Sequence, residues 1–202
     1  GVDDIWCLGD VVGYGPDPNR CLDLIRRNAE LCLMGNHDWA VLNKPVSFNS
    51  MATRMIYQTK EWMKEADSSE EKIEERYEFL QTRPHSREQE EFFLVHASPR
   101  SELSEYILPS DVRYDEEKLL DIFDRIDSYC LVGHTHVPCC ITEDLELIVP
   151  DGEGAGVDLG EKKAIINVGS VGQPRDGDTR SCYATLEADR LTWHRVPYRY
   201  QK

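Results

Sequence analysis

The chain has 202 residues, and its 38 acidic against 23 basic side chains give a formal net charge of -15 at pH 7. This charge works against nonspecific binding to nucleic acid or to an anionic membrane. No apolar run reaches the ~20 residues of a membrane-spanning helix, so we expect no membrane partner. The length and a hydrophobic content of 40% predict one domain over residues 1–202.

Four short apolar runs have the length and the flanking residues of strands that are buried on both faces of a sheet. Between them, apolar residues recur with helical spacing, and the first such segment follows Asp17 and Pro18, an expected N-cap and first-turn proline. Strands that alternate with helices predict an α/β domain with a largely parallel central sheet. The expected strands are 5–8, 31–34, 92–95 and 129–132, and the expected helices are 21–29, 51–66 and 119–126.

Residues 66–91 are densely charged, and the pattern predicts a solvent-exposed helix followed by a loop in preference to an interaction arm. From residue 139 onward the sequence changes to short strands, which residues 151–162 and several turns separate. Alternation through Tyr183, Thr185 and Glu187 predicts an antiparallel hairpin near the end. The last part should therefore be rich in strands.

Polar side chains follow the ends of the four predicted strands. Because the carboxyl ends of parallel strands lie along one edge of a sheet, these side chains should converge. A lone histidine at a strand end is more simply explained as a polar residue beside the core, and for His96 alone we prefer that explanation. Four of the six histidines fall at these ends, however, so the group as a whole predicts a site. Its members are Asp10, Asn36, His37, Asp38, His96, His134 and His136.

Glycines at positions 9, 35 and 133 precede these polar residues and relieve crowding where each strand turns. If the backbone after Gly133 stays extended for two residues, alternate side chains point the same way, so His134 and His136 both face the crevice. Imidazole and carboxylate groups suit zinc, manganese, iron and related divalent ions. The set is larger than one tetrahedral ion needs, so two ions that share a carboxylate fit better.

The motifs "GD" at 9–10, "GNHD" at 35–38, His96 and "GHTH" at 133–136, in this order, resemble the calcineurin-like metallophosphoesterase superfamily. Two further segments, 9–19 and 167–178, look like its small bacterial and archaeal phosphodiesterase branch, which is distantly related to diadenosine tetraphosphatases. The resemblance covers nearly the whole chain. It implies a two-sheet β-sandwich flanked by helices, the four-layer αββα fold. It also implies a hydrolase with two divalent ions, and the sequence does not determine whether these are Mn2+, Fe2+, Zn2+ or Ni2+.

The resemblance further implies a role for each matching residue. Two ions hold a bridging hydroxide in line with the leaving oxygen. His37 would donate a hydrogen bond or proton to the phosphoryl or leaving oxygen, and Asp38 would orient it. The implied metal ligands are Asp10, which bridges both ions, Asn36, His96 and His134, which complete the site of the second ion, and His136, which binds the first ion.

The chain departs from the family pattern at its start. Family members begin with a strand that ends in Asp-x-His and supplies two ligands of the first metal, and no such motif precedes Ile5. The first strand and its helix would also be absent. We therefore expect that a front segment is missing from the sequence, and the alternative is a fragment that is poor in metal and inactive.

Two roles for the segment around Ser170 and Arg175 are equally consistent with the sequence. Both side chains could approach the substrate, since a guanidinium recognises phosphate oxygens bidentately. Alternatively, the segment is a glycine-rich turn in which Arg175 pairs with Asp176 or Asp178. Tyr14, shortly after the first motif, could either stack on a base or cover the site.

These patterns favour a phosphodiesterase whose partner is a small organic or nucleotide phosphoester. A serine/threonine-type protein phosphatase shares the same core but needs a shallow cleft for a peptide. A noncatalytic metal-binding scaffold would explain the missing Asp-x-His motif, but it has no use for the acid that His37 and Asp38 provide. Whether the chain forms a homo-oligomer is left open.

The seven cysteines point to a reducing compartment. Cys7, Cys32 and Cys130 lie inside apolar runs, where a thiol behaves as a small hydrophobic group. Cys139 and Cys140 would face opposite sides of a strand, so we interpret them as packing residues. With no basic and apolar leader in front, we expect a cytoplasmic protein.

Overall fold

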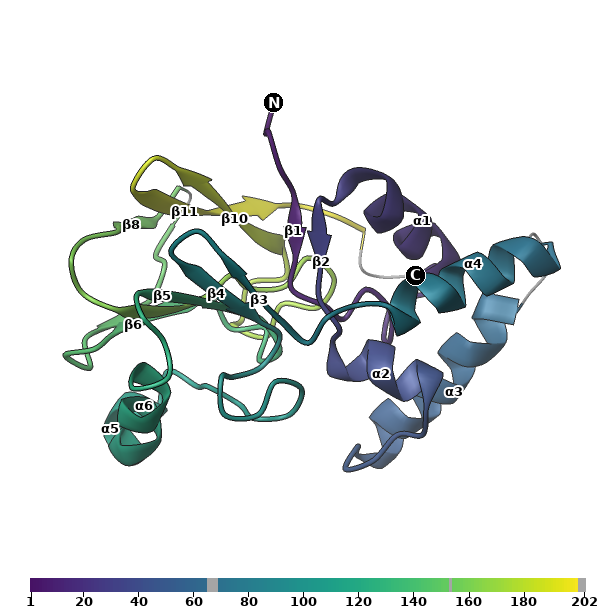
Figure 1. The fold of residues 1–202 in the computed structure, drawn as a ribbon, viewed down its shortest axis with the longest axis horizontal. Helices are drawn as coiled ribbons and strands as arrows, with labels where there is room; N and C mark the ends of the chain where they lie inside the picture. The colour runs from purple at the N-terminus through teal and green to yellow at the C-terminus, as the bar shows by residue number, and fades with distance from the viewer. Residues whose placement is uncertain (65–68, 153, 200–202) are drawn as a thin grey trace. The chain divides into compact units, whose positions relative to one another are not determined.

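A computed structural model describes residues 1–64, 69–152 and 154–199 of the chain (Figure 1). The chain divides into two compact units, which we call unit 1 (residues 1–86) and unit 2 (residues 87–202). Each unit has a hydrophobic core of its own. The prediction of one domain over the whole chain stays a prediction. Within the described ranges, no helix combines the length and the apolar character that crossing a membrane requires.

In its described residues, unit 1 consists of two short parallel strands and helices that pack around one core. The predicted helix 21–29 is present and begins at Pro18, the expected first-turn proline. Leu22, Ile56 and Leu80 come from three different helices and are fully buried in this core. The elements are β1 (Trp6–Cys7), α1 (Pro18–Asn28), β2 (Leu31–Cys32), α2 (Asn36–Leu42), α3 (Ser50–Lys64) and α4 (Glu70–Gln81).

The charged segment 66–91 forms α4, and its first residues, 66–68, lie outside the described part. Most of α4 is exposed, as predicted, but one face carries Arg76, of which only 5% is accessible. Arg76 Nε and Nη2 donate to the two carboxylate oxygens of Asp23 on α1, at 2.9 and 2.7 Å. A bidentate ion pair therefore joins the first and last helices of unit 1.

In its described residues, unit 2 contains a six-stranded sheet in the order β3-β4-β5-β9-β6-β7 and a three-stranded sheet in the order β10-β11-β8. The neighbours β4, β5 and β9 are parallel, whereas β6 and β7 run antiparallel. The elements are β3 (Ser86–Gln89), β4 (Phe92–Val95), α5 (Asp111–Tyr114), α6 (Glu116–Phe123), β5 (Tyr129–Val132), β6 (Cys139–Thr142), β7 (Leu147–Ile148), β8 (Gly156–Asp158), β9 (Ala164–Asn167), β10 (Ser181–Glu187) and β11 (Arg190–Val196).

The parallel strands of unit 2 are buried on both faces, which is why their sequences are continuous apolar runs. Every residue of β5 and of β9 is buried. Ile122 and Phe123 of α6 pack in one core with Cys130 and Ile165 from these strands. At the carboxyl ends of β4 and β5, Gly133 N donates to His96 O at 2.9 Å. The predicted convergence of these two strand ends is therefore confirmed within unit 2.

The α/β class is confirmed, and so are the strands 92–95 and 129–132 and the terminal hairpin of β10 and β11. Two expectations were wrong in detail. The predicted loop at the end of 66–91 contains β3, and the predicted connection 151–162 contains β8. Both strands are short and form the outer strand of a sheet, so neither has the apolar run that marks a buried strand.

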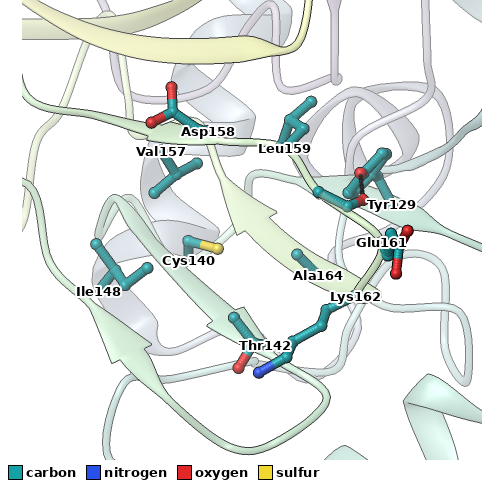
Figure 2. A pocket seen from close by; sticks show the side chains of 11 residues that line it. Tyr129, Cys140, Thr142, Ile148, Val157, Asp158, Leu159, Glu161, Lys162 and Ala164 are labelled. Atoms are coloured by element: carbon teal, nitrogen blue, oxygen red, sulfur yellow. Dashed lines mark hydrogen bonds between the residues drawn. The ribbon is translucent and has the colours of Figure 1, made fainter.

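A cavity of about 410 Å³ lies in unit 2 (Figure 2). Cys140 lines it, and burial raises the pKa of this thiol to about 11. Cys139 and Cys140 are each 2% exposed, so both thiols are buried, as packing residues would be. Tyr129 of the cavity wall begins β5, whereas His134 follows the end of that strand. The cavity and the predicted metal ligand therefore lie at opposite ends of β5.

Candidate metal centre

In unit 1, the turn that follows β1 lies directly against the turn that follows β2. Asp10 has a left-handed backbone, with φ 54°, and its Oδ1 accepts a hydrogen bond from His37 N at 2.9 Å. A Cβ atom on Gly35 would lie 2.1 Å from both Asp10 N and Asp10 Oδ1. Only glycine fits there, so the sequence prediction that Gly35 relieves crowding is confirmed.

The "GNHD" motif forms the start of a helix. Asn36, His37 and Asp38 are the first three residues of α2, and Gly35 is its N-cap. Asp38 is fully buried, and its carboxylate accepts hydrogen bonds from Gly35 N at 3.1 Å and from Val12 N at 3.2 Å. Asp38 thus ties the two turns together, which is a structural task that the sequence did not indicate. Its orienting of His37 stays a prediction.

The His37 ring is packed between aromatic side chains. Its centroid lies 4.6 Å from that of Tyr14 and 5.0 Å from that of Phe48. A Cβ atom on Gly13, whose φ is 142°, would come within 2.5 Å of His37 Nδ1. The side chain is 6% exposed, so its neighbours fix where this imidazole lies. Tyr14, whose role the sequence left undecided, is part of this packing.

In unit 2, two of the predicted ligands lie side by side. The rings of His96 and His134 have their centroids 5.0 Å apart in an edge-to-face arrangement, and both side chains are buried. The ring of Tyr106, which is 49% exposed, lies 4.3 Å from that of His134. Two adjacent buried imidazoles fit a transition-metal ion, for which imidazole is a preferred ligand.

The backbone of the "GHTH" turn differs from the predicted extended conformation. His134 and His136 both have left-handed backbones, with φ 57° and 63°, and Thr135 N donates to Gly133 O at 2.6 Å. Asn167, at the end of β9, holds this tight turn because its Nδ2 donates to Gly133 O at 2.6 Å and to Thr135 Oγ1 at 2.9 Å. The expectation of two further extended residues was therefore wrong.

Sequence reasoning missed Asn167, which is 1% exposed. A signal was present, because an apolar run, residues 164–166, ends in this polar residue just as other runs end in predicted ligands. Its Oδ1 also accepts from Gly169 N at 2.9 Å, so this side chain shapes the turn after its own strand as well.

His136 contacts the segment that follows β9. His136 Nδ1 lies 2.7 Å from Gln173 O, and Arg175 N donates to His136 O at 3.1 Å. Ser170 Oγ accepts from Gln173 N at 3.0 Å, and both Nε and Nη2 of Arg175 donate to Gln173 Oε1. The structure therefore brings Ser170 and Arg175 together around Gln173, a residue that the sequence reasoning did not select.

The carboxylates next to Arg175 pair with other arginines. Asp176 pairs with Arg195, and Asp178 pairs with Arg180. Hydrogen bonds from Arg180 lower the pKa of Asp178 to about 2, so it is ionised at neutral pH. The pair of Asp176 with Arg195 joins the segment to β11, which carries Arg195.

The α/β fold, with carboxylate, amide and imidazole side chains after its strands, is typical of an enzyme that binds divalent metal ions. The chain belongs to the calcineurin-like phosphoesterase superfamily, whose domain matches residues 1–190. The family is metal-dependent and acts on phosphoesters. Where each ligand binds in this chain stays a prediction.

Two relatives support this membership. The chain is 36% identical over 195 residues to the uncharacterized protein MJ0912 of Methanocaldococcus jannaschii, across 93% of this chain and 72% of that protein. It is also similar to the crystal structure of a metallophosphoesterase from Sphaerobacter thermophilus, with a TM-score of 0.80 and 38% identity. That match covers 98% of this chain and 79% of the other.

Proposed function

We propose that the chain is a phosphodiesterase that hydrolyses a small organic or nucleotide phosphoester with two divalent metal ions. The observation that carries this proposal is the link between Asp10 and His37 in unit 1. Asp10 Oδ1 accepts a hydrogen bond from His37 N, so the implied bridging ligand and the implied acid share one rigid frame. A scaffold without catalysis has no use for the acid that His37 would supply.

The proposed metal ligands are Asp10, Asn36, His96, His134 and His136. Divalent ions at these side chains would polarise the phosphoryl oxygens and activate water. The same nitrogen and oxygen donors accept Mn2+, Fe2+, Zn2+ or Ni2+, and we propose Mn2+ as the first ion to try.

The protein side chains have distinct tasks in this proposal. His37 donates a hydrogen bond or proton to the phosphoryl or leaving oxygen. Packing against Tyr14 and Phe48 holds its ring and keeps water away from it. Arg175 binds an anionic oxygen of the substrate, since a guanidinium offers two parallel donors to a phosphate. We further propose a cytoplasmic enzyme that does not bind membranes or, nonspecifically, nucleic acid.

The test is the hydrolysis of bis-p-nitrophenyl phosphate by chelator-treated protein with Mn2+ added back. His37→Ala should lower kcat by about 100-fold or more, which is the usual contribution of a general acid. The control is His85→Ala, because His85 is exposed and lies outside the predicted site. A serine/threonine-type phosphatase would instead prefer a phosphopeptide. A scaffold would bind Mn2+ and hydrolyse neither substrate.

A further inference from the structure

The segment between β9 and β10, residues 168–180, is held by contacts along its length. Cys182 N donates to Ser170 O at 2.8 Å, and Tyr198 OH donates to Gly172 O at 2.7 Å. The ion pair of Asp176 with Arg195 fixes its far end. A segment anchored at so many points can hold a side chain in one orientation.

Gln173 makes two kinds of contact within this segment. Its backbone carbonyl lies 2.7 Å from His136 Nδ1, and because a carbonyl only accepts, the ring must donate from Nδ1. His136 therefore offers Nε2 to a metal. The side-chain Oε1 of the same glutamine accepts from Arg175 Nε at 3.2 Å and from Nη2 at 2.7 Å. One residue thus contacts both an implied metal ligand and a guanidinium.

We infer that Gln173 is a positioning residue that holds the Arg175 guanidinium beside His136, where it binds an anionic oxygen of the substrate. This inference rests on the proposed function. Two donors on one edge of the guanidinium fix its plane, and a fixed plane is what bidentate recognition of phosphate oxygens requires. Ser170 serves the same end, since its Oγ accepts from Gln173 N and holds the turn that carries the amide.

The neutral amide is central to the inference. The amide of Gln173 orients Arg175 without contributing an opposing negative charge. A carboxylate at position 173 would accept the same hydrogen bonds but would compete with the phosphate for the guanidinium.

The experiment compares Gln173→Ala, Gln173→Glu and Arg175→Ala, with Gln58→Ala on an exposed face of α3 as the matched control. For each Mn2+-loaded protein we would measure the binding of inorganic phosphate by calorimetry, the bound metal, the melting temperature, and kcat and KM with bis-p-nitrophenyl phosphate. Gln173→Ala should weaken phosphate binding and raise KM by about tenfold, the usual effect of losing a charged hydrogen bond. The metal content and kcat should change little.

Two comparisons separate positioning from a merely structural role. Gln173→Ala should have no further effect on phosphate binding in an Arg175→Ala background, because both substitutions remove the same interaction. Gln173→Glu should weaken phosphate binding more than Gln173→Ala, although it preserves the hydrogen bonds. Additive effects in the double variant, or wild-type phosphate binding by Gln173→Glu, would overturn the inference.

The outcomes also distinguish this inference from the proposed function. If phosphate binding depends on Gln173 but the protein does not hydrolyse the diester, the inference about Gln173 holds and the phosphodiesterase proposal is rejected. If the protein hydrolyses the diester but the Gln173 variants bind phosphate as the wild type does, the inference is rejected and the phosphodiesterase proposal holds.

Discussion

At the scale of single residues, the position of His37 depends on a neighbour that has no side chain. Gly13 has a φ of 142°, and a Cβ atom there would lie 2.5 Å from His37 Nδ1. An alanine would therefore strain the backbone and displace the imidazole that the proposed function uses. Gly15 lies two residues further on, and a Cβ atom there would meet nothing within 4 Å.

We predict that Gly13→Ala lowers kcat for bis-p-nitrophenyl phosphate by about 100-fold, since displacing a catalytic group by about 1 Å has an effect of this size. Gly15→Ala should leave kcat unchanged. Circular dichroism would show that both variants are folded. A folded Gly13→Ala protein with wild-type kcat would mean that the observed position of His37 is not needed for catalysis.

At the scale of elements, α1 and α4 of unit 1 are joined by the pair of Asp23 with Arg76. The hydrogen bond from Arg76 lowers the pKa of Asp23 below its ordinary value. A carboxylate with a lowered pKa in the folded state contributes stability that is present above its unfolded pKa. That contribution is lost as the pH falls through the folded pKa. The pair should therefore stabilise unit 1 at neutral pH, and this stabilisation should be lost in acid.

We predict that Asp23→Asn lowers the free energy of unfolding in urea by about 2 kcal/mol at pH 7, as expected for a hydrogen-bonded charge with a buried partner. The difference from wild type should stay constant down to about pH 5 and shrink below about pH 4. Glu74→Gln, which changes an exposed carboxylate on α4, the helix that carries Arg76, is the control and should show a difference near zero. A deficit of Asp23→Asn that persists unchanged at pH 3 would contradict this account of the pair.

The elements also show why some of the fold could be predicted and some could not. The strands β4 and β5 were predicted with the correct bounds because each is buried on both faces and is therefore a continuous apolar run. The short outer strands β3 and β8 have no such run, and backbone pairing with a neighbour defines them. Periodicity reports burial, so it cannot find a short strand with few buried residues.

In the candidate site, too, local patterns predict some features, and contacts between distant residues determine the others. The ligand types and their order could be predicted because each follows an apolar run. The left-handed turns at His134 and His136 could not, because Asn167 holds them from more than 30 residues away in sequence. The packing of His37 between Tyr14 and Phe48 is likewise a tertiary contact that no local pattern encodes.

At the scale of the whole molecule, a net charge of -15 repels an anionic substrate. In the proposed function, the metal ions and Arg175 supply the local positive charge that overcomes this repulsion. The rate with an anionic diester should therefore depend on the metal that is loaded. Bound metal should also stabilise the folded state, because the unfolded chain does not bring the proposed ligands together.

We predict that Mn2+ stabilises the folded protein. At a free concentration of about 100 times its Kd, one bound ion raises the free energy of unfolding by about 2.7 kcal/mol, and calorimetry of chelator-treated protein with and without Mn2+ would show the rise in melting temperature. Asn36→Ala and His96→Ala should each reduce that rise, whereas His85→Ala should not. If only His96→Ala reduces the rise, Asn36 holds no metal ion. In that case the phosphodiesterase proposal loses the metal ligand that directly precedes His37.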